Sequence, residues 1–120
     1  MDYLVCKEGE LRERSCRLVQ AGDVQIGVFR VKGKLVAYAN NCIHQGGPVC
    51  QGEILGKVEE VLGTDKTIIS ERFSENEIHL VCPWHGWEYN LETGECAADR
   101  RLRLRPYPVV LRGDEVYVKV

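Results

Sequence analysis

Residues 82–89 read Cys-Pro-Trp-His-Gly-Trp-Glu-Tyr, and this stretch carries the strongest structural signal in the chain. Its cysteine and histidine are separated by two residues. Upstream, residues 42–48 read Cys-Ile-His-Gln-Gly-Gly-Pro, with one residue between the cysteine and the histidine. Each motif places one thiol and one imidazole in a loop rich in glycine and proline. At this spacing both groups can point into one site from a single loop.

Together the two loops offer two sulfur and two nitrogen ligands, from Cys42, His44, Cys82 and His85. This set suits zinc, and it also suits a [2Fe–2S] cluster in which two histidines replace two cysteines on one iron. Zinc-finger ligands usually pair Cys with Cys in one half and His with His in the other. Each half is mixed in this chain, which favours the cluster and leaves a zinc-binding interaction domain as an alternative.

The segments around these loops are short and β-branched, and Gly, Asn and Asp residues separate them. Predicted strands cover residues 25–31, 35–39, 77–82, 88–91, 109–111 and 116–120. Many short strands at this spacing predict an all-β sandwich or barrel. The sequence predicts no long amphipathic helix.

Size, composition and charge bound the function. The chain has 120 residues, of which 44% are hydrophobic and 28% charged, as expected for a single domain over 1–120. A formal net charge of −2 argues against a general nucleic-acid binder. The longest apolar runs, such as 109–111, are too short to span a membrane, and residues 1–6 have no basic segment typical of a secretory signal. We therefore expect a cytoplasmic protein that binds neither nucleic acid nor a membrane.

The two motifs and their flanks resemble the Rieske iron–sulfur family, whose signature is C-x-H followed by C-x-x-H. The agreement extends to residues 46–48 after the first motif and to 86–89 and 91–94 after the second. The resemblance covers roughly residue 20 to the end. It implies a Rieske-type antiparallel β-sandwich with a small cluster-binding subdomain, built from loops at about 42–50 and 82–89.

The resemblance also implies one Rieske-type [2Fe–2S] cluster as cofactor. Carried over to this chain, Cys42 and Cys82 would hold one iron, and His44 and His85 the other. Neutral imidazoles in place of thiolates lower the negative charge of such a cluster, so it is reduced more easily than a four-cysteine cluster.

This chain departs from one branch of the family. Rieske proteins of respiratory and photosynthetic complexes carry an extra cysteine in each loop, and these form a disulfide; the matching positions here are Gly47 and Trp84. A serine that hydrogen-bonds the cluster in that branch is replaced by Trp87. A lost donor lowers the potential, so the pattern resembles the low-potential ferredoxin and oxygenase branch. Tyr89 either offers a hydroxyl to the site or serves as a core aromatic.

The chain between the two motifs is longer than in compact Rieske ferredoxins. The excess falls at about 56–76, where apolar groups at 67–69 and 72–73 alternate with turn signals at 63–66 and 74–77. We interpret this segment as an inserted hairpin or lobe, which is either a tolerated surface insertion or part of a partner surface.

The resemblance implies a soluble one-electron carrier, a Rieske-type ferredoxin that passes electrons from a flavin reductase to a terminal oxygenase. We do not expect catalysis by the chain alone, because an oxygenase iron site needs two more histidines and a carboxylate, and only His79 remains. A small Rieske-like subunit of a larger reductase, such as nitrite reductase, is the alternative. We expect a monomer, with an oligomer as the alternative.

Several reactive or charged residues fall outside this site. Four cysteines are predicted to be free thiols that pack in the fold: Cys6, Cys16, Cys50 and Cys96. His79 is predicted to be a surface or hydrogen-bonded histidine, not a ligand. Strand alternation would place Arg101, Arg103 and Arg105 on one face, either as a solvated surface or as a docking surface for an acidic redox partner.

Overall fold

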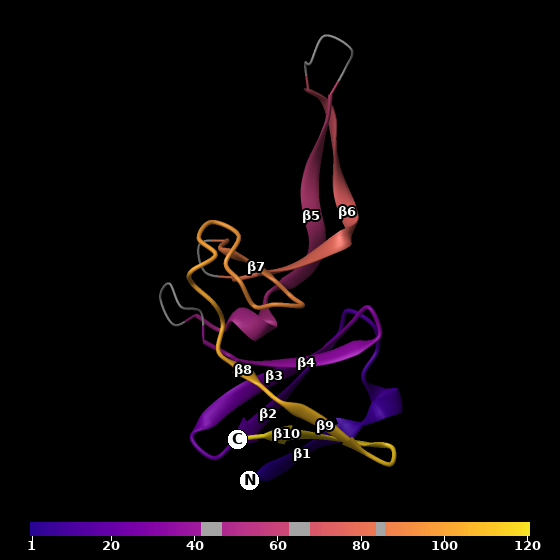
Figure 1. Ribbon diagram of the computed structural model, residues 1–120, viewed down its shortest axis with the longest axis vertical. Helices are drawn as coiled ribbons and strands as arrows, with labels where there is room; N and C mark the ends of the chain where they lie inside the picture. Colours follow the sequence, from indigo (N-terminus) through magenta and orange to yellow (C-terminus); the bar gives the residue numbers. More distant parts are fainter. Residues whose placement is uncertain (42–46, 63–67, 84–85) are drawn as a thin grey trace.

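Figure 1 shows the computed structural model of the protein, which describes residues 1–41, 47–62, 68–83 and 86–120. For residues 57–62 and 68–76 the description covers the backbone only. Within these ranges the chain forms ten strands in three antiparallel sheets, two short 3-10 helices and no α-helix. The 3-10 helices are η1 (Glu8–Glu10) and η2 (Val49–Gln51). The all-β prediction is therefore confirmed.

The first sheet brings the two ends of the chain together (Figure 1). Its order is β1-β10-β9, with β1 at Asp2–Lys7, β9 at Val109–Arg112 and β10 at Glu115–Lys119. The ammonium group of Met1 donates a hydrogen bond of 2.9 Å to the carbonyl of Val120.

The second sheet has the order β2-β3-β4-β8 and forms the middle layer. Its strands are β2 (Cys16–Ala21), β3 (Val24–Val31), β4 (Lys34–Ala39) and β8 (Pro106–Tyr107). The strands predicted at 25–31 and 35–39 are confirmed, and they pair with each other as a hairpin. Its turn places Lys32 and Gly33 at φ 51° and 76°, a left-handed conformation that glycine adopts without strain.

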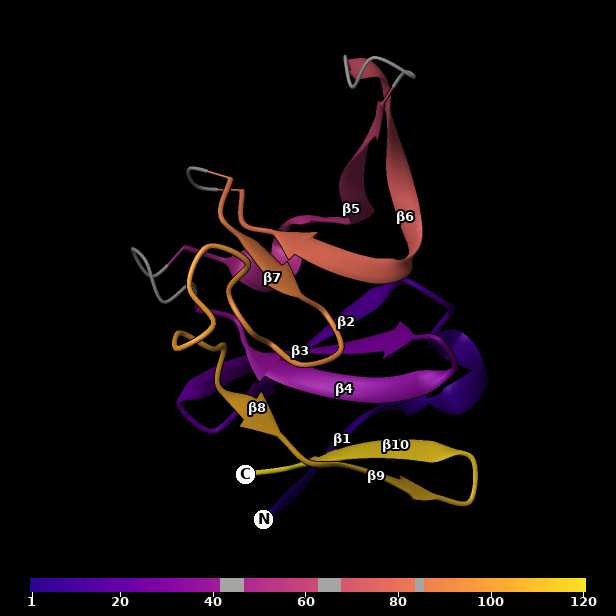
Figure 2. The ribbon, with the colours of Figure 1, turned by 45° about the horizontal axis from the view of Figure 1, so that its top comes forward.

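The third sheet carries a ribbon that projects from the body of the molecule (Figures 1 and 2). Its order is β5-β6-β7, with β5 at Glu53–Leu62, β6 at Ile68–Val81 and β7 at Glu88–Asn90. The hairpin predicted at about 56–76 lies on this ribbon. The turn predicted at 74–77 is wrong, because β6 continues through these residues.

The register explains the polar signal at 74–77. Gly56 pairs with Ile78 and Val58 pairs with Phe73, so residues 74–77 stand opposite a single residue of β5. The segment therefore bulges within the strand, and the ribbon bends there (Figure 2). Bulges and turns favour similar polar residues, so the sequence pattern did not separate them.

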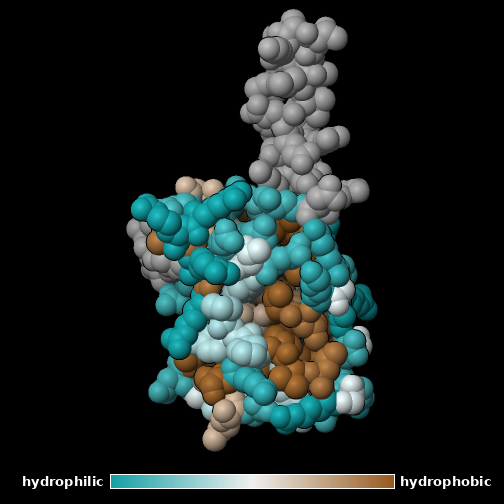
Figure 3. Space-filling view, in the orientation of Figure 1, coloured by the Kyte–Doolittle hydropathy of each residue, from teal (hydrophilic) through white to brown (hydrophobic). Residues whose placement is uncertain are grey.

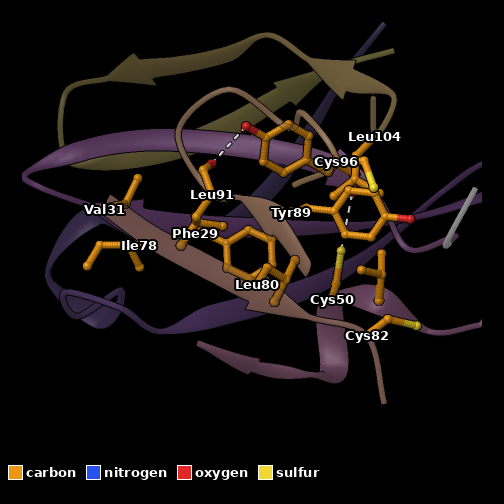
Figure 4. Packing of buried hydrophobic residues seen from close by; sticks show 12 residues of the cluster. Phe29, Val31, Cys50, Ile78, Leu80, Cys82, Tyr89, Leu91, Cys96 and Leu104 are labelled. Atoms are coloured by element: carbon orange, nitrogen blue, oxygen red, sulfur yellow. Dashed lines mark hydrogen bonds between the residues drawn. The ribbon is translucent and has the colours of Figure 1, made fainter. Parts of the chain in front are cut away.

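Two clusters of buried side chains meet at the middle sheet. Strand β3 contributes to both, because alternate residues of a strand point to opposite faces. Ile26 and Val28 pack towards the first sheet, and Phe29 and Val31 pack towards the third. Among the described residues, the cluster between the second and third sheets holds the three buried aromatic side chains and three of the four buried thiols (Figure 4).

Apolar side chains also reach the surface over β4 and β9 (Figure 3). Leu35 and Val109 are half-buried there, and Leu111 keeps 47% of its surface exposed. Among the residues that the structure describes, no helix has the length and apolarity needed to cross a membrane.

Candidate metal centre

The first ligand loop leaves the fold at the end of β4 and returns at η2, and Asn40 ties its two ends together. The side-chain oxygen Oδ1 of Asn40 accepts a hydrogen bond of 2.8 Å from the backbone N–H of Cys50. Its Nδ2 donates to Oε1 of Gln25 at 2.8 Å and to Oε1 of Gln51 at 3.4 Å. One side chain thus fixes the separation between the start and the return of the loop.

The second ligand loop joins β6 to β7 and is closed by a backbone hydrogen bond. The N–H of Cys82 donates to the carbonyl of Trp87 at 2.8 Å. Gly86 sits at φ 70°, which a side chain would strain. Pro83 and Gly86 are exposed, whereas Cys82 retains only 1% of its surface. The loop therefore reaches solvent while its cysteine faces the interior.

The return of the first loop packs directly on the start of the second. A Cβ atom built at Gly52 would lie 1.7 Å from the carbonyl oxygen of Val81 and 3.2 Å from Cδ of Pro83. Only glycine fits at this contact, which brings the two loops to the same end of the fold. Figure 4 shows Cys50, Cys82 and Tyr89 at one end of the core. Sequence reasoning missed Asn40 and Gly52, because both act through contacts between distant segments.

Of the four predicted ligands, the structure describes Cys82. Its thiol belongs to an apolar cluster that includes Val49, Leu80 and Tyr89. A buried sulfur donor with apolar walls fits an iron–sulfur cluster, because thiolate is the ligand such clusters use and apolar walls limit the access of water.

The other three predicted ligands, Cys42, His44 and His85, lie outside the described residues. Within the described part of the chain, no group of three or more His, Cys, Asp or Glu side chains could hold a metal ion. The complete ligand set therefore stays a prediction.

The aromatic residues near the second loop contribute to packing. Tyr89 has no exposed surface and belongs to the core cluster, which confirms its role as a core aromatic. Trp87 is half-buried and packs against the same cluster. Trp84 lies outside the described residues.

The four cysteines predicted to be free are unbridged, and Cys6, Cys50 and Cys96 are buried. Cys16 is half-buried, and its sulfur lies against Gly27 together with that of Cys50, since a Cβ at Gly27 would lie 3.2 Å from the Cys16 sulfur and 2.6 Å from the Cys50 sulfur. Burial raises the pKa of Cys16 to about 12. Burial also raises the pKa of Cys50, and the neighbouring Cys16 adds to the effect. Both thiols are therefore protonated at neutral pH and are weak nucleophiles.

His79 is buried and hydrogen-bonded through both ring nitrogens. Its exposed fraction is 3%. Nδ1 lies 2.9 Å from Oε1 of Glu88, and Nε2 lies 2.7 Å from Oε2 of Glu77. The prediction of a hydrogen-bonded histidine is confirmed, and the surface alternative is wrong. With both nitrogens engaged, this imidazole has no lone pair directed at a metal.

The arginine segment keeps the predicted alternation but does not form a strand. Arg101, Arg103 and Arg105 are exposed and Leu104 is buried. Outside the named strands, the segment makes a single β-bridge in the described chain, between Arg103 and Glu95. The segment bonds to two different parts of the chain. The Leu104 N–H donates to the Gly94 carbonyl, in the loop after β7, at 2.8 Å, and the Arg105 carbonyl accepts from the N–H of Ala39 in β4 at 2.9 Å. It therefore has no single strand to pair with along its length.

A β-sandwich that brings the described ends of two Cys/His loops to one end of the fold, with the buried thiol of Cys82 beside them, fits a metalloprotein of the iron–sulfur type. The chain belongs to the Rieske [2Fe–2S] domain family, whose model matches residues 1–108. Its cofactor is accordingly one Rieske-type [2Fe–2S] cluster. The match begins at residue 1 and includes β1 and β2, so the sequence reasoning that began the resemblance near residue 20 placed its start too late. The match ends at residue 108, before β9, whereas the resemblance was expected to reach the end of the chain.

Solved structures share this fold. The ferredoxin of carbazole 1,9a-dioxygenase from Nocardioides aromaticivorans IC177 has a TM-score of 0.68 and 22% identity, covering 98% of this chain and 96% of that chain. A proposed NADH-dependent nitrite reductase small subunit from Mycobacterium tuberculosis has a TM-score of 0.73 and 18% identity, covering 100% and 96%. At these identities the likeness establishes the fold alone.

A curated relative is also similar in sequence. An NAD(P)H nitrite reductase of Emericella nidulans is 24% identical over 106 residues, which cover 85% of this chain. The chain spans only 8% of the length of that protein.

Proposed function

We propose that the protein is a soluble, cytoplasmic one-electron carrier, a Rieske-type ferredoxin that passes electrons from a flavin reductase to a terminal oxygenase. The observation that carries this proposal is the buried thiol of Cys82 at the junction of two loops that both reach one end of the fold. The likeness in fold to a dioxygenase ferredoxin supports it.

In this proposal Cys42 and Cys82 hold one iron, and His44 and His85 hold the other. The bound cluster supplies a reversible one-electron couple. The chain contributes the apolar wall of Leu80 that limits water at the cysteine side, and the exposed second loop gives electrons a short path to a partner.

The proposal can be tested on protein purified without oxygen. Its iron and sulfide are measured, and its visible absorption and electron paramagnetic resonance spectra are recorded. We expect two irons and two sulfides per chain and a reversible one-electron couple. His85→Ala should abolish the visible spectrum. The matched variant His79→Gln should retain it, because His79 is already bonded to two carboxylates. Zinc in place of iron, or loss of the spectrum in His79→Gln alone, would contradict the ligand assignment.

A second candidate function is the small subunit of a nitrite reductase. Two observations favour it: the fold of the Mycobacterium tuberculosis protein and the sequence similarity to the Emericella nidulans enzyme. Gentle affinity purification of the tagged chain from its native host, followed by size-exclusion chromatography, separates the two functions. A stoichiometric complex with a reductase subunit supports the subunit function, and elution as a single chain supports the carrier.

A further inference from the structure

A groove beside the first ligand loop carries two arginines. Its volume is about 400 Å³, and its polar lining comes from Asp23, Gln25, Asn40, Asn41, Arg103 and Arg105. Asn40 and Asn41 are the last described residues before the segment 42–46. The groove therefore lies directly at the base of the loop that carries two of the predicted ligands.

Backbone contacts hold the arginines at this place. The Leu104 side chain retains only 1% of its surface exposed, and the Leu104 N–H donates to the Gly94 carbonyl at 2.8 Å. The carbonyl of Arg105 accepts a hydrogen bond of 2.9 Å from Ala39, the final residue of β4. Because Leu104 points inward, its neighbours Arg103 and Arg105 are directed outward beside the loop.

Both guanidinium groups are oriented, and neither has a carboxylate partner in the described part of the chain. Nη2 of Arg103 donates to the carbonyl of Thr93 at 3.0 Å, and the Arg105 guanidinium lies 5.5 Å from the centre of the Tyr107 ring. Neither arginine forms an ion pair with any residue that the structure describes. Such groups can bind a carboxylate through two parallel hydrogen bonds, and their fixed orientation lowers the entropy lost on binding.

The nearby acids leave this positive charge largely uncompensated. Glu92, which lines the adjoining surface with Arg103, is bound by Lys32 at 2.8 Å and Lys34 at 3.7 Å. Asp23 is the one acid among the residues that line the groove. The groove is therefore locally positive on a chain whose formal net charge is −2.

We propose that this groove docks a carboxylate-rich surface segment of the protein that exchanges electrons with the cluster. The proposal rests on the electron-carrier function and names the chemistry of the partner. Whole-molecule attraction would favour a basic partner, because the net charge is negative. A local pair of arginines at the loop base instead steers an acidic segment to the place where electron transfer requires close approach.

A peptide-binding assay tests the surface itself. A fluorescein-labelled hexaglutamate peptide is titrated with the holoprotein at low ionic strength, and fluorescence anisotropy measures the binding. We expect the double variant Arg103→Gln/Arg105→Gln to weaken binding about five- to thirtyfold, the equivalent of about 1–2 kcal/mol. The matched control Arg12→Gln/Arg112→Gln removes the same charge elsewhere, and its Arg112 also lies over a tyrosine ring. Equal weakening in both double variants, or none in either, would overturn the proposal.

Oxidation of the reduced holoprotein by hexacyanoferrate(III) tests the position of the surface. One electron passes from the reduced cluster to the anion, which becomes hexacyanoferrate(II). Because the reagent is an anion, we expect the second-order rate constant to fall with added salt, and Arg103→Gln/Arg105→Gln to remove most of that dependence. A rate constant that rises with salt in the unmodified protein would overturn the proposal. The peptide assay does not depend on electron transfer, so a failed carrier function and a failed docking surface give different results.

Discussion

Asn40 is the residue whose side chain holds the first ligand loop closed. Its amide accepts from the Cys50 N–H and donates to Gln25 and Gln51. Because Cys50 is buried, we expect Asn40→Ala to leave its N–H without a partner and to lower the free energy of unfolding by about 1–3 kcal/mol. Urea unfolding measures this change. Asn40→Asp keeps the acceptor and should lose less, and equal losses in the two variants would contradict the role of the Cys50 bond.

Gly52 is the residue that allows the two ligand loops to meet. A methyl group there would overlap the Val81 carbonyl, and neither the β5–β6 ladder nor Pro83 offers room. We expect Gly52→Ala to lower the free energy of unfolding by about 1–3 kcal/mol and to reduce the iron content of the protein. Gly9→Ala is the control, because a Cβ at Gly9 meets nothing within 4 Å. Thermal unfolding and iron analysis of both variants check the prediction, and similar behaviour of the two would refute it.

At the scale of elements, the β3–β4 hairpin is stabilised by a carboxylate from outside it. Glu13 accepts hydrogen bonds from the backbone N–H groups of Gly33 at 2.9 Å and Lys32 at 2.7 Å. These bonds, that of Gly33 foremost, lower the pKa of Glu13. A lowered pKa in the folded state means that the stabilisation is complete above the unfolded pKa and is lost as pH falls through the folded pKa.

This linkage gives a pH-dependent prediction for Glu13→Gln. We expect the variant to be less stable than the unmodified protein at pH 7, by less than about 1 kcal/mol because the site is exposed. The difference should shrink as the pH is lowered from 5 towards 3, about one unit either side of the ordinary glutamate pKa. Urea unfolding at a series of pH values provides the measurement. A difference that stays constant over this range would exclude the carboxylate charge as its cause.

Elements defined by local patterns were predictable from the sequence, whereas those defined by distant partners were not. The hairpin over 25–39 follows from alternation around a glycine turn. Strand β1 went unpredicted, because its partner β10 lies at the opposite end of the chain. The same contrast holds at the site. Cysteine and histidine spacing identifies the ligand loops, but the contacts of Asn40 and Gly52 join segments that only the folded chain brings together.

At the scale of the whole molecule, the β5–β6 ribbon makes the protein long, with extents of 56 × 31 × 21 Å. The pairs from Glu53↔Val81 to Gly56↔Ile78 lie at the base, next to the second ligand loop, and the pairs from Val58↔Phe73 onward form the projecting part (Figure 1). A two-stranded ribbon that leaves the body contributes little stability of its own. The base should therefore support the site without the projecting part.

Replacing residues 58–73 by a short glycine-containing turn tests this division of the ribbon. We expect the shortened protein to keep the cluster spectrum and to unfold within about 1 kcal/mol of the complete chain, because surface loop changes of this kind have small closure costs. If the projecting part instead serves as a partner surface, the shortened protein should keep its spectrum and lose electron transfer to its redox partner. Loss of the cluster itself would contradict both interpretations, since it would mean that the ladder at Glu53–Gly56 cannot hold the second loop in place without the ribbon beyond it.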